Sequence, residues 1–155
     1  MELWMFETPL GLMAVGEEGG AIVRLWLPGQ PLPRLMPHQT PLLERAEGQI
    51  MEYLNHQRQV FDLPLSPAGT DFQKKVWAAL SDIPYGQTRS YGDIARRIGC
   101  PGGARAVGMA NHANPIPILI PCHRVVGAKG QLTGYAGGLE LKGALLALEG
   151  RKNPL

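Results

Sequence analysis

Cys122 and His123 form the neighbouring pair in this sequence that is best suited to nucleophilic chemistry. A thiolate is the nucleophile. Because a free cysteine is only a few per cent ionised at neutral pH, an adjacent imidazole and a basic surrounding would activate it. The pair directly follows Pro121 and lies between two apolar, β-like segments. A buried structural cysteine beside a chance histidine is the alternative interpretation, and the residues alone leave both open.

The other cysteine and the remaining histidines do not extend this site. Cys100 follows Gly99 where a helix is expected to end, and no histidine, lysine or carboxylate stands beside it, so we interpret it as structural. Four histidines and two cysteines offer no pair at the spacing of zinc ligands, and we expect no metal. The sequence has neither a P-loop nor a Gly-rich dinucleotide fingerprint, so we expect no cofactor.

Short helices are predicted in the second half of the chain, ahead of the Cys-His pair. Thr70 with Gln73, and Ser90 with Asp93, fit capping boxes that would begin two helices. A third short helix fits residues 103–110. Short helices joined by tight turns are typical of a helix-turn-helix, a motif that binds DNA.

The elements around and after the pair suggest a winged variant of that motif. Residues 127–130 are typical of a hairpin turn with a strand beyond it. Residues 139–149 predict a final helix, which would end at Gly150.

The first third of the chain predicts short strands and one helix. Thr40 and Pro41 are typical of a helix start, and apolar residues recur at helical spacing behind them. A further strand is expected at residues 61–63. Turn residues separate the three runs that predict strands, which are 3–7, 12–16 and 21–27.

Composition and charge limit the classes of protein that fit. Of the 155 residues, 45% are apolar and 18% charged, which suits a packed core. No apolar run approaches the ~20 residues of a membrane helix, and no signal peptide is evident. With two cysteines a disulfide scaffold is excluded, so we expect a cytoplasmic protein with free thiols and no membrane association.

The two halves of the chain differ in charge. Residues 1–66 hold four basic and eight acidic residues, a net charge of −4, whereas residues 67–155 hold eleven basic and five acidic residues, a net charge of +6. Pro64, Pro67 and Gly69 are typical of a linker at this change of sign. A basic half favours a polyanion partner, and a solvated basic face without a partner is the alternative.

Ordered motifs over residues 69–150 resemble the O6-alkylguanine-DNA alkyltransferase family, also called methylated-DNA–protein-cysteine methyltransferases. The motifs that carry the resemblance are Gly69-Thr70-Asp71-Phe72-Gln73, Ile83-Pro84-Tyr85-Gly86-Gln87-Thr88, Ala104-Arg105-Ala106-Val107-Gly108, Asn114-Pro115-Ile116-Pro117-Ile118, Pro121-Cys122-His123-Arg124-Val125 and Gly134-Tyr135-Ala136-Gly137-Gly138. The first third is only loosely similar.

The resemblance implies a mixed α/β (α+β) fold in two domains. Residues 1–66 would form a small ribonuclease-H-like domain, and residues 67–155 a winged helix-turn-helix domain that carries the active site. The family moves an alkyl group from O6 of guanine in duplex DNA, with O4-alkylthymine as a further candidate substrate, onto its own cysteine. Each molecule acts once. We expect a monomer, and cooperative binding along DNA is left open.

The resemblance also assigns roles to the reacting groups. Cys122 would be the nucleophile, His123 would take its proton, and Glu149 would orient the imidazole. Tyr135, assisted by Lys142, would stabilise the departing guanine oxygen.

Further residues would hold the DNA and the extruded base, since O6 is inaccessible inside a stacked pair. Tyr91, just inside a capped helix whose NH groups favour phosphate, would crowd a phosphate, and Arg105 would fill the gap in the duplex. Backbone groups of Val125 and Ala136 would read the guanine edge. Asn114 would tie the helix-turn-helix to the active-site strand. The remaining DNA contacts implied are those of Ala104, Ala106, Gly108 and Arg124.

Three other functions compete with this one. Non-enzymatic damage binders share the DNA-binding frame but replace the reactive cysteine, which is present here as Cys122. Regulatory relatives carry an extra cysteine-rich domain, for which 155 residues leave no room. A Cys-His hydrolase would need an oxyanion-loop signature, and none is evident.

Overall fold

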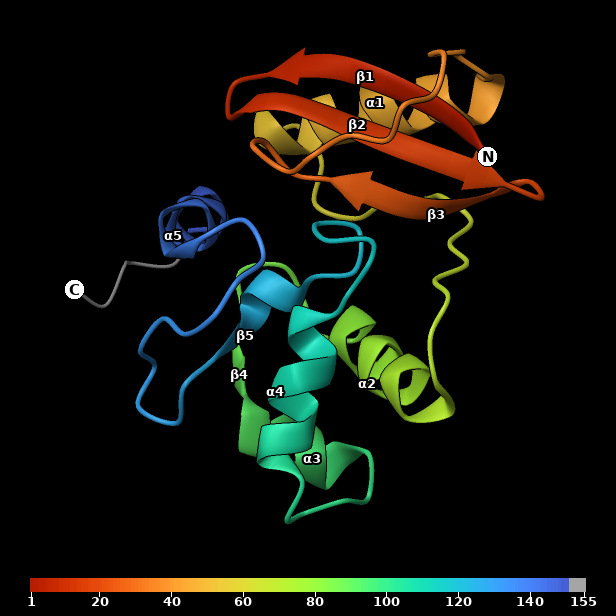
Figure 1. Cartoon of the computed structure of the whole chain (residues 1–155). Coiled ribbons are helices and arrows are strands. Elements are labelled where there is room, and N and C mark those ends of the chain that lie inside the picture. The colour runs from red at the N-terminus through yellow and green to blue at the C-terminus, as the bar shows by residue number, and fades with distance from the viewer. Residues whose placement is uncertain (151–155) are drawn as a thin grey trace. The chain divides into compact units, whose positions relative to one another are not determined.

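The computed structural model describes residues 1–150 and divides the chain into two compact units, Met1–Ala68 and Gly69–Leu155 (Figure 1). The division falls two residues after the boundary that the linker composition suggests. Arg151 and Lys152, which the charge count of the basic half includes, lie outside the described residues.

The N-terminal unit is a three-stranded antiparallel sheet with one helix packed on it (Figure 1). The strands pair in the order β1-β2-β3, and helix α1 contacts all three. Val15 of β2 and Ile50 of α1 are buried between the sheet and the helix, and Leu3, Ala14 and Trp26 form a cluster on the other face of the sheet. The elements are β1 (Glu2–Thr8), β2 (Gly11–Glu18), β3 (Ala21–Trp26) and α1 (Pro41–Leu54).

Local sequence explains where α1 begins and which face it buries. Thr40 is the N-cap and its hydroxyl accepts a hydrogen bond from the backbone N–H of Leu43, while Pro41 occupies the first turn, where no N–H is needed. Leu43, Ala46 and Ile50 recur at helical spacing and are buried. The predicted helix is therefore confirmed.

The strand expected at residues 61–63 is absent from the described structure. The chain instead runs beside β3 slightly later, because Ile22 donates its N–H to Pro64 and accepts one from Ser66. This gives an isolated parallel bridge between Ile22 and Leu65. Since Pro64 has no N–H to donate, a longer ladder cannot form there.

The C-terminal unit is mostly helical. Both predicted capping boxes are present, at Thr70–Gln73 and Ser90–Asp93. Helix α4 packs against both α2 and α3, and Trp77 of α2 donates from Nε1 to the backbone oxygen of Ala110 in α4. The elements are α2 (Asp71–Ser81), β4 (Arg89–Ser90), α3 (Tyr91–Arg97), α4 (Ala104–His112), a 3₁₀ turn (Cys122–Arg124), β5 (Val125–Val126) and α5 (Leu139–Leu148).

The expected wing strand is not found in the described residues. The turn is present, since Gly127 donates its N–H to the oxygen of Gln131, but no strand follows it. Strand β5 instead pairs in parallel with β4, over two residues. Beyond Gln131 the chain bonds to side chains of α3 and α5 rather than to a neighbouring strand, which leaves it irregular.

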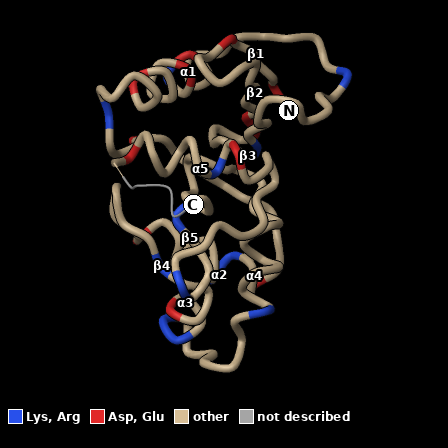
Figure 2. Tube along the Cα trace, turned by 90° about the vertical axis from the view of Figure 1, so that its left-hand side faces the viewer, with Lys and Arg blue, Asp and Glu red and all other residues tan. Residues whose placement is uncertain are grey.

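The structure confirms a mixed fold of helices and strands. Figure 2 shows Lys and Arg on α3 and α4, and Asp and Glu on α1, in keeping with the opposite net charges of the two halves. None of the described helices combines the length and apolar character that crossing a membrane requires.

Candidate active site

A buried, proline-rich segment leads from α4 to Cys122. The side chain of Asn114 bonds to both ends of this segment. Its Oδ1 accepts from the N–H of Ile116 at 3.0 Å, and its Nδ2 donates to the oxygen of Ile120 at 2.9 Å. Within the loop, Ile118 has a φ of 73°, a conformation that β-branched residues rarely adopt. Such strain persists only where the surroundings impose it, so this segment is held in one shape.

Cys122 lies in the 3₁₀ turn, not between two strands as its apolar neighbours suggest. Its side chain is buried, and the residue is 4% exposed. Burial raises the pKa of the Cys122 thiol to about 11, although the Asn114 amide and the Lys142 ammonium act in the opposite direction. The group is therefore a thiol at neutral pH.

His123 and Glu149 form a fully buried pair. Nε2 of His123 lies 2.7 Å from Oε2 of Glu149, and both side chains are 0% exposed. Glu149 follows the last residue of α5, and its Oε1 also accepts from the N–H of Gly86 at 3.2 Å. Burial lowers the pKa of His123, because it penalises the imidazolium more than Glu149 favours it.

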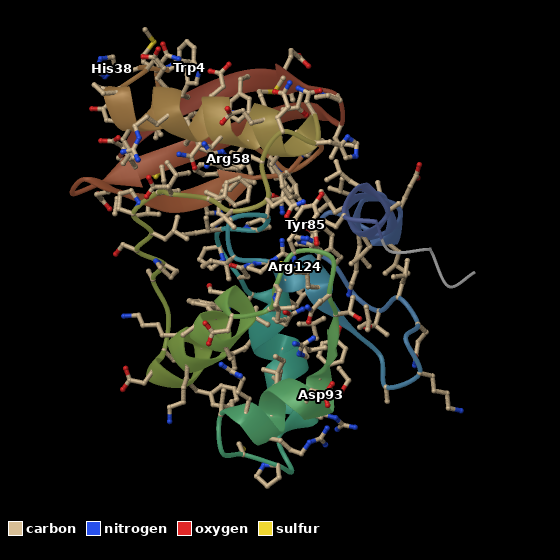
Figure 3. All side chains as sticks on the ribbon, turned by 180° about the vertical axis from the view of Figure 1, so that it is seen from behind. Trp4, His38, Arg58, Tyr85, Asp93 and Arg124 are labelled. Atoms are coloured by element: carbon tan, nitrogen blue, oxygen red, sulfur yellow. The ribbon has the colours of Figure 1, made fainter. Side chains whose placement is uncertain are left out.

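Arg124 is not on a DNA-accessible surface. It is 7% exposed, and its guanidinium donates to Glu149 from Nε at 2.8 Å and from Nη2 at 3.0 Å. Its Nη1 donates to the oxygen of Ile83 at 2.7 Å, and its guanidinium lies 5.8 Å from the centre of the Tyr85 ring (Figure 3). The burial of Arg124 and these three hydrogen bonds contradict the expected DNA contact and make Arg124 a support for Glu149.

Tyr135 and Lys142 are both buried. Lys142 is 0% exposed, and its Nζ donates to the backbone oxygen of Thr133 at 2.6 Å. Tyr135 lies in the irregular stretch between the turn and α5, and its neighbour Ala136 is exposed. Val125, the other residue expected at the guanine edge, is buried at the start of β5.

Of the residues expected to face DNA, one lies on α3 and four lie on α4. Arg105 and Ala106 are exposed, and Ala104 and Gly108 are partly exposed. Tyr91 is partly exposed at the first position of α3.

The beginning of α3 is partly occupied by its own capping box. The hydroxyl of Ser90 accepts from the N–H of Asp93, and the Asp93 carboxylate accepts from the N–H of Ser90. The hydrogen bond from the Ser90 backbone N–H holds the pKa of the Asp93 carboxyl below its usual value. Two N–H groups at this end of α3 are therefore used within the helix cap, and the Asp93 carboxylate adds a negative charge beside Tyr91.

Two features on this side were missed by the sequence analysis. Met109 is 72% exposed and lies one helical turn after Arg105, which the i, i+4 spacing could have indicated. Thr133 bonds to Tyr91 and to Lys142, and no sequence pattern signals that.

No cluster of three or more His, Cys, Asp or Glu side chains suited to a metal ion occurs among residues 1–150. Both cysteines are free. Cys100, which the sequence analysis interprets as structural, is exposed in the turn after α3.

Comparison with known proteins agrees with this geometry. Residues 71–151 match the family described as 6-O-methylguanine DNA methyltransferase, DNA binding domain. A methylated-DNA–protein-cysteine methyltransferase of Methanosarcina acetivorans is 46% identical over 150 residues, covering 94% of this chain and 96% of its own. The constitutive enzyme of that name from Bacillus subtilis is 48% identical over 151 residues, covering 92% of each.

A solved structure is similar over nearly the whole chain. The crystal structure of Mycobacterium tuberculosis OGT in complex with DNA has a TM-score of 0.90 and 43% identity, covering 99% of this chain and 96% of its own.

Fold, site and matches together define a DNA repair methyltransferase whose methyl acceptor is a cysteine of the protein. The chain belongs to the 6-O-methylguanine DNA methyltransferase family. Its reaction is direct repair, in which a methyl group moves from DNA to the protein without excision of the base.

Proposed function

We propose that Cys122 is the methyl acceptor and that its substrate is O6-alkylguanine in duplex DNA. The observation that carries the proposal is the 2.7 Å contact between His123 and Glu149, buried and adjacent in sequence to the thiol. A nucleophile, a base and a carboxylate that orients the base are the recurrent parts of nucleophilic catalysis. Arg124 holds the carboxylate by two further hydrogen bonds.

His123 takes the thiol proton. Because the pKa of Cys122 is raised to about 11, the reaction needs a base at neutral pH. A carboxylate can only accept hydrogen bonds, so the ring nitrogen that faces Glu149 carries a proton and Nδ1 is the basic nitrogen. Since the pKa of His123 is lowered, its imidazole is neutral at physiological pH and able to accept the proton. Glu149 then stabilises the imidazolium.

Methyl transfer forms the Sγ–carbon bond while the carbon–O6 bond breaks. The electron pair of the broken bond stays on the guanine, which takes up one proton in place of the one that the thiol lost and becomes the normal base. Tyr135 stabilises the departing oxygen, and the buried Lys142 supports it. A thioether has no acidic leaving group, so Cys122 is not regenerated and each molecule acts once.

The base reaches Cys122 only after it leaves the stack. Arg105 is exposed on α4, where it would occupy the gap in the duplex. The small residues beside it, Ala104, Ala106 and Gly108, let the helix backbone approach the DNA closely. Tyr91 contacts a phosphate, and backbone groups of Val125 and Ala136 bind the base edge.

Incubation with a duplex that contains one O6-methylguanine tests the proposal. We expect the peptide containing Cys122 to gain the mass of one methyl group, and the duplex to lose it, in a one-to-one ratio. Cys122→Ser should end transfer while DNA binding remains, and Cys100→Ser is the matched control that should transfer normally. An unmodified Cys122 peptide with DNA still bound would instead support a damage binder. A duplex with O4-methylthymine, assayed alongside, defines the substrate range.

A further inference from the structure

The segment that carries Tyr135, residues 131–138, has no regular secondary structure. It lies between the turn at residues 127–130 and the first residue of α5, Leu139. Because a segment without a ladder depends on side-chain contacts for its position, the contacts of its individual residues decide where Tyr135 stands.

Two of those contacts meet at Thr133. Its hydroxyl oxygen lies 2.6 Å from the hydroxyl oxygen of Tyr91, at the start of α3. Its backbone oxygen accepts from Nζ of Lys142, in α5, at 2.6 Å. Thr133, which stands two positions before Tyr135, therefore connects α3 to α5.

Tyr91 lies at the same time beside the expected DNA surface. A Cβ atom built on Gly108 of α4 would lie 3.7 Å from its ring, so the ring faces that helix closely. Tyr91 also borders an open groove of ≈ 660 Å³, which Arg89, Arg96 and Asp93 help to line, and Arg96 is ion-paired with Asp93. Arg89 bonds to the neutral oxygens of Thr88 and Gln87, so a hydroxyl in the same groove as its guanidinium is suited to a phosphate oxygen.

We infer that Thr133 is a positioning residue that aims the Tyr91 hydroxyl at the DNA backbone and couples that contact to the segment carrying Tyr135. A phenol has a single proton to donate. When the Thr133 hydroxyl donates to the Tyr91 oxygen, the Tyr91 hydroxyl can donate its own proton to a phosphate instead of to Thr133. The inference rests on the proposed function, because it assumes that Tyr91 contacts DNA.

The DNA contact of Tyr91 is coupled to the segment that carries Tyr135 because Tyr91 and Lys142 both bond to Thr133. A phosphate that accepts from Tyr91 polarises its hydroxyl and strengthens the bond donated by Thr133. Thr133 is thereby held in place when DNA is bound, and with it the backbone oxygen that Lys142 binds and the nearby Tyr135. The contact with DNA thus favours the arrangement that the transfer reaction requires.

The test compares transfer from a duplex containing O6-methylguanine with transfer from the free O6-benzylguanine base, which has no phosphate. In Thr133→Val, the ratio of the duplex rate to the free-base rate should fall about threefold to tenfold, as expected for one neutral hydrogen bond. Thr133→Ser keeps the hydroxyl and should restore the ratio. Thr8→Val, which removes a hydroxyl from the N-terminal unit, is the matched control with the wild-type ratio.

Tyr91→Phe completes a double-mutant cycle. It should lower the ratio as Thr133→Val does, and the double variant should be no worse than either single one. A wild-type ratio in Thr133→Val, equal losses in the Val and Ser variants, or independent losses that multiply in the double variant would each overturn the inference. A wild-type protein that reacts with neither substrate would overturn the proposed function, and this inference with it.

Discussion

The two units of the molecule place their charged side chains differently. In the N-terminal unit the ion pairs are exposed: Arg58 binds Glu52 at 2.9 Å with side chains that are 29% and 46% exposed. In the C-terminal unit Arg124 binds Glu149 at 2.8 Å with side chains that are 8% and 0% exposed. Distances and residue types are similar, so burial is the main difference.

Burial changes what such a pair does. An exposed pair gains little, because water and salt screen it. A buried pair has lost its hydration and is tolerated only when its polar atoms are satisfied. Glu149 meets this condition through His123, Arg124 and Gly86. Exposed ion pairs occur in both units, as between Arg97 and Asp82 in the second. We conclude that these are surface features, whereas the buried contacts of Glu149 hold the proposed catalytic geometry at a cost in stability.

The largest effect is expected from breaking the buried pair. Glu149→Ala leaves Arg124 buried without its carboxylate, which should lower the free energy of unfolding by about 3–5 kcal/mol. The same variant should slow methyl transfer, because His123 loses its orienting group. Urea unfolding followed by circular dichroism measures the first effect and single-turnover transfer the second. A loss below about 1 kcal/mol would mean that the buried pair behaves like an exposed one.

The next largest effect concerns the two cysteines, one exposed and one buried. Because burial raises the pKa of Cys122 to about 11, its alkylation by iodoacetamide in the Cys100→Ser protein should rise about tenfold per pH unit until near that value. The raised pKa also means that the stability Cys122 contributes is complete below pH 9 and is lost as the pH rises through 11. Half-maximal reactivity below pH 9 in the DNA-free protein would contradict this.

The smallest effect is expected from the exposed pair. Glu52→Gln removes the charge next to Arg58 with little change of shape, and it should alter the free energy of unfolding by less than about 1 kcal/mol. Methyl transfer should stay at the wild-type rate. The same urea series, run beside Glu149→Ala, provides the direct comparison. A loss of unfolding free energy as large as in that variant would refute the contrast between the exposed pair and the buried pair.

Local sequence was enough to predict the elements that begin with a cap. Thr40, Thr70 and Ser90 each accept from an N–H three residues away, so the interaction that starts the helix is contained in the pattern that predicts it. Cys122 and His123 were singled out for a similar reason, since they are adjacent in the chain. Glu149 came only from the family resemblance, because no local pattern links it to His123.

The tertiary structure decided which way side chains face and what they meet. Arg124 follows His123 directly, yet its contact with Glu149, 25 residues later, buries it and leaves it unsuited to the expected DNA contact. Where a wing strand was expected, the chain contacts α3 and α5 instead. Thr133 bonds there to Tyr91, 42 residues before it, and to Lys142, nine residues after it. Caps and helical spacing act over three or four residues, whereas burial and long-range pairing depend on how the elements pack, so only the folded chain could assign these roles.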